Sequence, residues 1–395
     1  MEIRRIAILT FGVGAGHLRA SQAIHQALHD GADNVDARTI DALDLAKPWF
    51  QRFYVRPYGW MVRRAPWAWR KMFAWRQFRR HAATAPDWFF RRGCRSVLEQ
   101  LRTLQPHLVI ATEVGAAELA ALGRREGWFN APILAAQTDF HAEFPWVKRE
   151  IDVYCVGSDE AKCQLIGWGV SANRILTCGV SVDPAFALHF DRAELRRALG
   201  LDAKRPVVLV MSGGMGPAPL DAIIRSLEVC RQPLQVIAVA GRNPNLRLRL
   251  EALRRQIAVD LHVFGWTDAL PELMGAASVL ITNPGGVTTS EAMAAGVPMI
   301  LTHPISGTEE QHLRLLVQQG VALPAQRPEE IPTLVSLLLE TPEQREALER
   351  RAREVARPDA AYAVAQVARA LLEKATFIDL LAAPPPGTGD SAYVM

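Results

Sequence analysis

The chain has 395 residues, which at roughly 100 to 200 residues per domain predicts two domains. Apolar residues make up 49% and charged residues 22%, a composition that excludes a disordered, collagen-like or disulfide-stapled protein. No apolar run reaches the roughly 20 residues of a spanning helix, the start does not resemble a signal peptide, and the scattered cysteines include no Cys-x-x-Cys pair. We therefore expect a cytoplasmic protein without a structural zinc site.

The net charge of +4 hides a segregation of charge along the chain. Residues 47–95 contain thirteen Lys or Arg and one acid, a net charge of +12, whereas the rest of the chain has a net charge of −8. The same segment holds six of the ten tryptophans. Because exposed tryptophan is avoided unless it binds something, this basic and aromatic segment indicates a binding surface.

The first half of the chain has the pattern of a doubly wound domain. A buried strand at residues 3–11 is followed by a turn containing Gly12, Gly14 and Gly16, and then by a helical pattern over about 18–29. Later strands alternate with helical stretches and are expected at 108–112, 133–137, 153–156 and 175–178. This alternation predicts a parallel sheet with helices on both faces, in a domain of residues 1–185.

The pattern restarts after a polar segment, with a strand at 207–211, a glycine turn at 212–216 and a helix at 220–230. Further strands are expected at 236–240, 261–263, 279–282 and 299–301, and further helices at 245–258, 270–276, 288–295 and 342–381. We predict a second doubly wound domain of residues 186–382, whose last helix could pack back on the first, and a disordered tail at 383–395. The cleft between two such sheets is the expected ligand site.

The segment 282–298 carries the richest chemical signal. A strand ends at Thr282, the following Pro-Gly-Gly turn leaves backbone N–H groups uncovered, and a helix is expected to begin at Thr288 or Thr289. That arrangement is suited to phosphate. Glu291 lies one turn further, where a carboxylate can accept hydrogen bonds from a diol such as ribose. The structural alternative is a capping box from Thr288 to Glu291.

Several motifs together resemble those of two-domain (GT-B) glycosyltransferases. They are Gly14-Ala-Gly-His17, Thr138-Asp139-Phe140 with Trp146, Gly179–Asp183, Gly213-Gly-Met-Gly-Pro217, Ala240–Asn243, Phe264-Gly-Trp266, Asn283–Glu291 and Pro304–Glu310. The set is similar to the monogalactosyldiacylglycerol synthases and processive diacylglycerol glucosyltransferases, and more distantly to the lipid-intermediate N-acetylglucosaminyltransferase of peptidoglycan synthesis. The likeness spans about residues 5–375. It implies a GT-B fold, in which two Rossmann-like domains face each other across a cleft.

The resemblance implies a site for a uridine diphosphate sugar in the second domain. Glu291 would bind the ribose, the backbone near Phe264 the uracil, and Glu309 and Glu310 the sugar. The glycine turns would hold the diphosphate, and the remaining donor-site candidates are Gly213, Gly214, Met215, Gly216, Arg242, Gly285, Gly286 and Thr288. On the acceptor and membrane side the candidates are Gly14, Gly16, Trp60, Trp67, Trp69, Arg70, Trp75 and Trp146.

The general base is expected among three residues. His17 stands at a helix start, where the dipole favours the neutral imidazole that can take a proton; its structural alternative is a local hydrogen bond. The plant-type synthases have an Asp where this chain has Gly12, so Asp139 and Glu113 are the other candidates. Three departures from the family pattern leave the sugar open: Asn283, Thr308 and His312. Glu143 is a further departure, at a position where the family often has His, in the region of the base candidates.

The segment 47–95 has three interpretations. Basic and aromatic side chains can bind nucleic acid, can lie at a bilayer interface with arginine on anionic lipid, or can form an ordinary solvated helix face. The resembling family carries an insertion here for membrane docking. We therefore favour an anionic membrane surface and expect no nucleic acid.

Together these features predict an inverting enzyme that moves a hexose from a UDP-sugar to a lipid hydroxyl, with diacylglycerol as the favoured acceptor, at the inner face of the cell membrane. No Asp-x-Asp triplet is present, so we expect no metal or cofactor; the UDP-sugar is a substrate. The alternatives are another lipid-linked or hydrophobic acceptor and a non-catalytic nucleotide-sugar-binding membrane protein. The glycine spacing at 12–16 argues against a dehydrogenase. The oligomeric state is left open.

Overall fold

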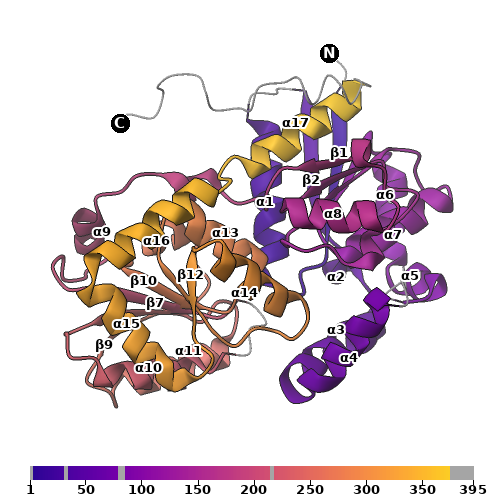
Figure 1. Ribbon diagram of the computed structural model, residues 1–395. Helices are drawn as coiled ribbons and strands as arrows, with labels where there is room; N and C mark the ends of the chain where they lie inside the picture. The colour runs from indigo at the N-terminus through magenta and orange to yellow at the C-terminus, as the bar shows by residue number, and fades with distance from the viewer. Residues whose placement is uncertain (1–2, 31–33, 79–84, 214–217, 374–395) are drawn as a thin grey trace.

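The computed structural model describes residues 3–30, 34–78, 85–213 and 218–373 (Figure 1). The predicted tail at 383–395 lies outside the described residues. The same holds for three donor-site candidates, Gly214, Met215 and Gly216.

Two parallel six-stranded sheets form the core, with strand orders β2-β1-β3-β4-β5-β6 and β12-β11-β10-β7-β8-β9. The first contains β1 (Arg4–Thr10), β2 (Val35–Asp41), β3 (Leu108–Ala111), β4 (Ile133–Ala136), β5 (Val153–Val156) and β6 (Ile175–Thr177). The second contains β7 (Val207–Met211), β8 (Gln235–Val239), β9 (Asp260–Phe264), β10 (Val279–Thr282), β11 (Met299–Leu301) and β12 (Ala322–Pro324). Their central strands are uniformly buried and rich in Val, Ile and Leu, as strands covered on both faces require. The prediction of two doubly wound domains is confirmed.

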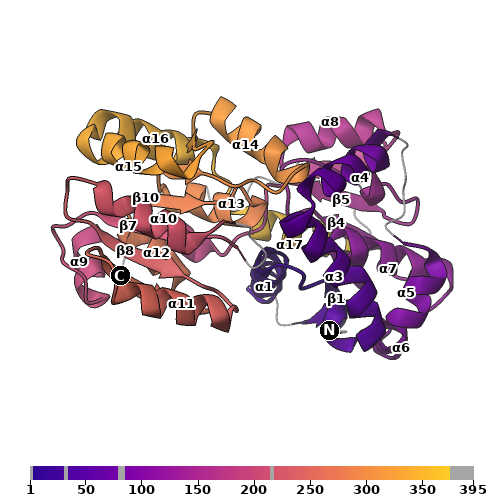
Figure 2. The ribbon, with the colours of Figure 1, turned by 90° about the horizontal axis from the view of Figure 1, so that it is seen from below.

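Helices cover both faces of the first sheet (Figures 1 and 2). One face packs against α1 (Ala15–His29) and α17 (Ala360–Glu373). The other face is covered by α2 (Ala42–Leu45), α5 (Asp87–Gly93), α6 (Arg95–Leu104), α7 (Val114–Arg125) and α8 (Asp159–Gly167).

The second sheet is covered in the same way. One face packs against α12 (Leu270–Ala276), α13 (Gly286–Ala295), α14 (Thr308–Gln318) and α16 (Pro342–Val355), and the other against α10 (Leu220–Ser226), α11 (Pro244–Arg254) and α15 (Ile331–Glu340). The remaining elements are α9 (Arg192–Ala198) and the 3₁₀ turns η1 (Phe144–Trp146), η2 (Ala172–Arg174), η3 (Pro184–Ala187), η4 (Leu227–Val229) and η5 (Pro328–Glu330).

Two strands and several helix boundaries differ from the predictions. The sequence pattern did not reveal β2 and β12, each of which is one of the two edge strands of its sheet and carries polar residues or proline. The single helix predicted over 342–381 is wrong, because α16 ends at Val355 and α17 begins at Ala360. Pro358 lies in the break, where its ring and missing N–H oppose a continuous helix.

The break lets the chain return to the first domain, where α17 packs on α1 (Figure 1). The Arg369 guanidinium donates to the carbonyl of Ala27 at 3.0 Å. At the crossing, Gly179 has φ +94°, and a Cβ there would lie 2.6 Å from the Cβ of Arg357. The two segments that connect the domains, one after β6 and one between α16 and α17, therefore pack against each other at a position that only glycine fits.

A helical hairpin projects from the first domain (Figure 1). It consists of α3 (Pro48–Arg64) and α4 (Pro66–Phe78) and is called the hairpin below. Its inner face buries Val62, Trp69 and Phe73 against Ile305 of the second domain. The hairpin thus extends from the first domain to the edge of the second domain.

Candidate active site

A cleft of about 570 Å³ lies between the two domains. Its polar wall is formed by residues of both domains, among them His17, Glu113, Asp139, Gly213, Gly285, Gly286, Thr288 and Glu309. Its apolar wall is formed largely by the hairpin and its neighbours: Phe53, Tyr54, Tyr58, Met61, Trp69, Met72, Phe89 and Trp146. Polar and apolar substrate groups can therefore meet in one space.

His17 lies in the first turn of α1, directly after the glycine-containing loop, and lines the cleft. Its Nδ1 is 2.8 Å from the hydroxyl of Thr138, and that hydroxyl donates to the carbonyl of Thr112 at 3.4 Å. Since the hydroxyl hydrogen is committed to a carbonyl, Nδ1 donates and Nε2 is the unprotonated nitrogen. Burial lowers the pKa of His17, against a smaller opposite effect of Asp139, so the ring is neutral at pH 7.

The other two base candidates are in different surroundings. Glu113 precedes α7, and its Oε2 accepts from the backbone N–H of Gly115 at 2.6 Å and of Ala116 at 3.2 Å. These two hydrogen bonds make Glu113 the N-cap of α7. Burial raises its pKa to about 8, so the side chain is protonated at neutral pH. Burial also raises the pKa of Asp139, while His17 opposes that rise.

The N-terminus of α13 faces the first domain. The helix begins at Gly286, two residues before the predicted Thr288, so a capping box from Thr288 to Glu291 is wrong. A Cβ at Gly286 would lie 2.2 Å from the carbonyl oxygen of Thr138. This glycine therefore lets the helix start approach the backbone of the opposite domain, next to His17 and Asp139.

Glu291 lies within α13 and is buried, with 2% of its side chain exposed. Burial raises its pKa to about 7, and the guanidinium of Arg19 opposes this rise. Arg19 Nη1 lies 3.8 Å from Glu291 Oε1. Close by, the Arg242 guanidinium lies 4.1 Å from the ring centroid of Trp266, which follows the end of β9 at Phe264. The candidate donor residues Glu291, Arg242 and Phe264 thus belong to neighbouring strand ends and helices.

Glu309 and Glu310 lie at the start of α14 and have different partners. Glu309 accepts from the side-chain amide of Asn283 at 2.7 Å and from the backbone N–H of Ile305 at 2.8 Å. Burial raises the pKa of Glu309 to about 7. Glu310 instead pairs with Arg70 of the hairpin, at 2.5 Å.

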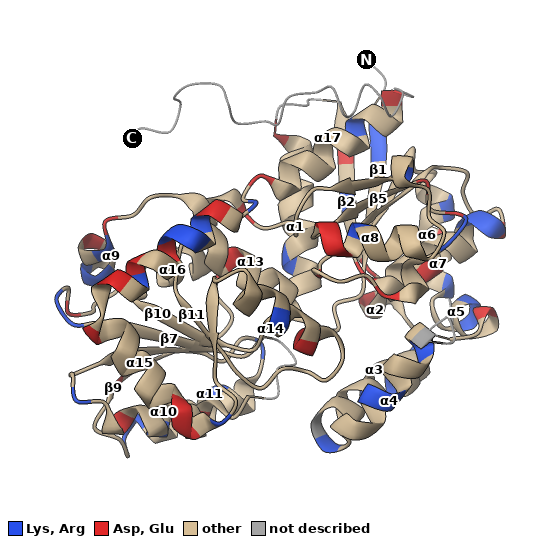
Figure 3. Cartoon of the chain, viewed as in Figure 1, with Lys and Arg blue, Asp and Glu red and all other residues tan. Residues whose placement is uncertain are grey.

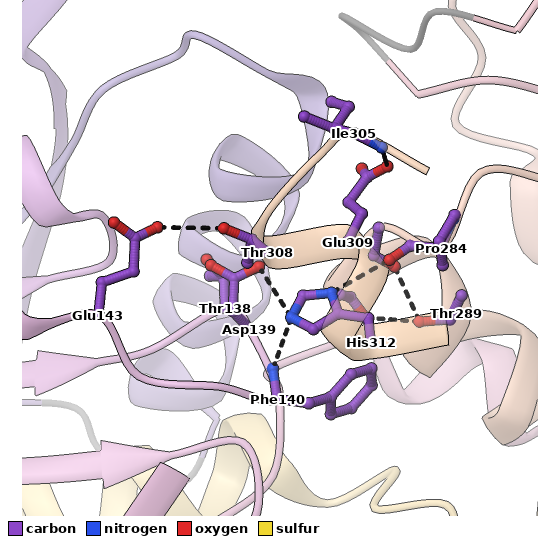
Figure 4. A network of polar contacts seen from close by, with 12 residues as sticks. Thr138, Asp139, Phe140, Glu143, Pro284, Thr289, Ile305, Thr308, Glu309 and His312 are labelled. Carbon is purple, nitrogen blue, oxygen red and sulfur yellow. Dashed lines mark hydrogen bonds and ion pairs between the residues drawn. The ribbon is translucent and has the colours of Figure 1, made fainter. Parts of the chain in front are cut away.

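A buried histidine connects the two domains beside these residues (Figure 4). His312 Nδ1 donates to the carbonyl of Pro284 at 3.1 Å, and Nε2 accepts from the backbone N–H of Phe140 at 3.3 Å. Burial lowers the pKa of His312 to about 4, so the ring is neutral. The sequence pattern marked His312 only as a departure from the family, whereas its position makes it an interdomain link.

The tryptophans of the basic segment, together with Trp146, differ in exposure, and Trp49 is partly buried against the core of the first domain. Trp60, Trp67 and Trp75 of the hairpin and Trp88 of α5 are exposed by 59%, 67%, 49% and 55%. Trp69 and Trp146 are buried and line the cleft, so they are not available to a bilayer. No Asp or Glu interrupts the basic residues of the hairpin (Figure 3).

Three residues that contact the site were not among the predicted site residues. They are Thr138, Arg76, whose Nη1 lies 3.8 Å from Glu143 at the cleft wall, and Arg19. Gly14 and Gly16, which were predicted, line the cleft beside His17. None of the three contacts could be read from local pattern, because each depends on how distant segments meet.

Within the described ranges, no helix is both long and apolar enough to cross a membrane. The described residues also contain no group of three or more His, Cys, Asp or Glu side chains placed to hold a metal ion.

Comparison with known proteins gives two family matches. Residues 17–182 match the monogalactosyldiacylglycerol (MGDG) synthase family, and residues 191–355 match the glycosyl transferases group 1 family. The processive diacylglycerol beta-glucosyltransferase of Bacillus cytotoxicus is 27% identical over 344 residues, which are 85% of this chain and 86% of that protein.

Two solved structures share the fold. MurG of Acinetobacter baumannii has a TM-score of 0.59 at 15% identity, and the match covers 93% of this chain and 99% of the MurG chain. HepE of Anabaena, solved in complex with UDP-glucose, has a TM-score of 0.57 at 15% identity, and the match covers 94% of this chain and 98% of the HepE chain.

The fold and the site thus define a two-domain GT-B glycosyltransferase. The first domain matches the monogalactosyldiacylglycerol synthase family and the second the glycosyl transferases group 1 family, and most of the chain is similar to the processive diacylglycerol beta-glucosyltransferases. The predicted resemblance and the predicted enzyme class, a hexosyl-transferring glycosyltransferase, are confirmed.

Proposed function

We propose that this glycosyltransferase moves a hexose from a UDP-sugar to the hydroxyl of diacylglycerol, with inversion, at a membrane surface. The observation that carries the proposal is the composition of the cleft. Its polar lining contains the helix start and acids that resemble a nucleotide-sugar site, its apolar lining comes largely from the hairpin, and His17 lines the same cleft. A lipid alcohol and a sugar nucleotide fit these two walls.

The neutral ring of His17 supports its role as general base. In the proposed step Nε2 takes the proton of the acceptor hydroxyl, whose oxygen attacks the anomeric carbon from the side opposite the diphosphate. The bond from that carbon to the diphosphate oxygen breaks, and UDP leaves with the electron pair. Inversion follows from this single displacement.

The leaving diphosphate gains negative charge as the bond breaks. We assign its stabilisation to the N-terminus of α13, where Gly285, Gly286 and Thr288 line the cleft. Glu291 would accept hydrogen bonds from the ribose, and Glu309 would face the sugar. In this scheme helix dipoles supply the positive potential and no metal ion is required.

Membrane docking is supported by the outer face of the hairpin and by α5. Four exposed tryptophans accompany Arg and Lys side chains on these elements, a combination that suits the interface of an anionic bilayer. The apolar wall of the cleft lies on the inner side of the same hairpin. A lipid taken from the docked surface would therefore reach His17 along the hairpin.

The test is a turnover assay with purified full-length protein and anionic vesicles containing diacylglycerol. UDP-glucose, UDP-galactose and UDP-N-acetylglucosamine are supplied separately, and the lipid fraction is analysed by mass spectrometry. The proposal expects a hexosyl diacylglycerol from one donor. Binding of a UDP-sugar without any lipid product from diacylglycerol would contradict it, and would favour another acceptor or a non-catalytic binder.

A further inference from the structure

One arginine of the first domain reaches into the candidate donor site of the second. Arg19 lies on α1, two residues after His17, and its side chain is 20% exposed. Its Nη2 donates to the carbonyl of Thr267 at 3.0 Å, and its guanidinium carbon lies 4.9 Å from the ring centroid of Trp266. A backbone acceptor and an aromatic face thus fix the guanidinium on the second domain.

The third contact of Arg19 is with Glu291, at 3.8 Å between Nη1 and Oε1. Among the described residues, Arg19 is the only cationic side chain in ion-pairing contact with this carboxylate. The charged groups that act on Glu291 are Arg19, which favours its ionised form, and Asp183 before η3, which disfavours it. A buried carboxylate without a counter-ion would take up a proton instead.

We propose that Arg19 is a positioning residue of the donor site: the acceptor domain supplies the counter-ion that keeps Glu291 ionised for the donor's ribose. The inference rests on the proposed function, because it takes Glu291 as the ribose-binding carboxylate. It adds that donor affinity depends on a residue of the opposite domain. By reciprocity of binding free energies, a bound donor then favours the domain contact that Arg19 makes.

A contrary role for the same contact is a plug, in which Arg19 occupies Glu291 until the ribose displaces it. The two roles predict opposite signs. Removing a counter-ion weakens nucleotide binding at neutral pH, whereas removing a plug strengthens it. The 3.8 Å separation leaves the carboxylate free to accept closer hydrogen bonds from a ligand.

The test is the dissociation constant of UDP, measured by calorimetry on the full chain at pH 7 and pH 9. For Arg19→Gln we expect binding to weaken roughly five- to tenfold at pH 7, because the pKa of Glu291 rises by about one unit, and to recover to within about twofold of wild type at pH 9. Glu291→Gln should weaken binding at both pH values, and adding Arg19→Gln to it should cost little more. Arg149→Gln, which removes an exposed arginine, is the matched control.

UDP binding by Arg19→Gln as tight as wild type, or tighter, at pH 7 would overturn the inference while Glu291→Gln still weakens binding. If Glu291→Gln also binds normally, the proposed donor site itself is wrong. If Arg19→Gln does not unfold cooperatively and is therefore misfolded, UDP binding by Arg19→Lys is measured instead. The lysine keeps the charge, so near-wild-type affinity supports the inference and a loss as large as that of Glu291→Gln overturns it.

Discussion

Arg70 Nη2 lies 2.5 Å from Glu310 Oε1, and this ion pair joins the outer hairpin to the helix that begins beside the candidate sugar site. Phe73, which lies with Arg70 on α4, packs in a small hydrophobic cluster with Ile305. The element that we propose docks on a membrane is therefore in direct contact with the segment that precedes Glu309. Lipid binding and sugar binding are adjacent in structure although more than two hundred residues apart in sequence.

We expect Arg70→Gln to weaken the apparent affinity for the sugar nucleotide modestly. The pair is partly exposed, and exposed ion pairs contribute about 0 to 1 kcal/mol, so KM for the donor should rise by no more than about fivefold. The measurement is steady-state kinetics at low and high salt. A rise that persists unchanged at high salt would show that the ion pair is not its cause.

Thr138 should affect turnover through His17. In Thr138→Val the hydroxyl that accepts from Nδ1 is lost, so the ring is free to change tautomer and kcat should fall by about tenfold or more with little change in donor KM. Thr138→Ser keeps the hydroxyl and should retain most activity. Equal activity of the valine and serine variants would contradict the assigned tautomer.

Donor affinity should depend on pH through Glu291. Burial raises the pKa of this carboxyl to about 7, and the ribose-binding form is the ionised one. Affinity for UDP should therefore reach its full value about one pH unit above the pKa and decrease by up to about tenfold per unit as the pH falls below the pKa. Calorimetry between pH 5.5 and 8.5 measures this, and a curve that is the same for Glu291→Gln would assign the titration to another group.

Four exposed tryptophans should hold the protein on anionic vesicles. Replacing Trp60, Trp67, Trp75 and Trp88 by Ala removes most of the large exposed aromatic surface of this region, so the variant should stay in the supernatant when vesicles are sedimented. Leu248→Ala removes an exposed apolar side chain of the second domain and should leave sedimentation unchanged. Sedimentation of the tryptophan variant with the vesicles would count against docking by this face.

His312 should contribute to stability and to the domain contact. In His312→Ala the carbonyl of Pro284 and the N–H of Phe140 lose a fully buried partner, at a cost of about 1 to 3 kcal/mol for each unsatisfied group. Chemical denaturation should show this loss. His141→Ala, which removes the ring stacked on His312 without breaking either hydrogen bond, should cost less.

Much of the fold could be predicted from periodicity, because buried parallel strands and glycine turns have strong local signals. Strands β2 and β12 lacked such a signal, because β2 mixes charged and apolar residues and β12 has only three residues and ends in proline. The break before α17 depended on a single proline at 358. Its packing on α1 is a tertiary contact that periodicity does not encode.

Motif residues could be placed from the sequence: His17 and Gly286 line the cleft, and Glu291 lies buried in α13 behind it. Contacts between domains could not be placed in this way. Thr138, Arg19 and His312 act on residues far away in the chain, and each has an ordinary local role that a single sequence cannot distinguish from a functional one. The same limitation applied to the tryptophans, since spacing did not separate the buried Trp69 from the exposed Trp67.

The central claim is that the cleft itself transfers a hexose to a lipid, and one parallel assay tests it most directly. Wild type and His17→Gln are incubated with labelled UDP-hexose and diacylglycerol vesicles, and labelled lipid, free hexose and bound UDP are measured. The account predicts labelled lipid from wild type only, with UDP affinity preserved in His17→Gln. Labelled lipid from His17→Gln at the wild-type rate, or free hexose as the sole wild-type product, would contradict it.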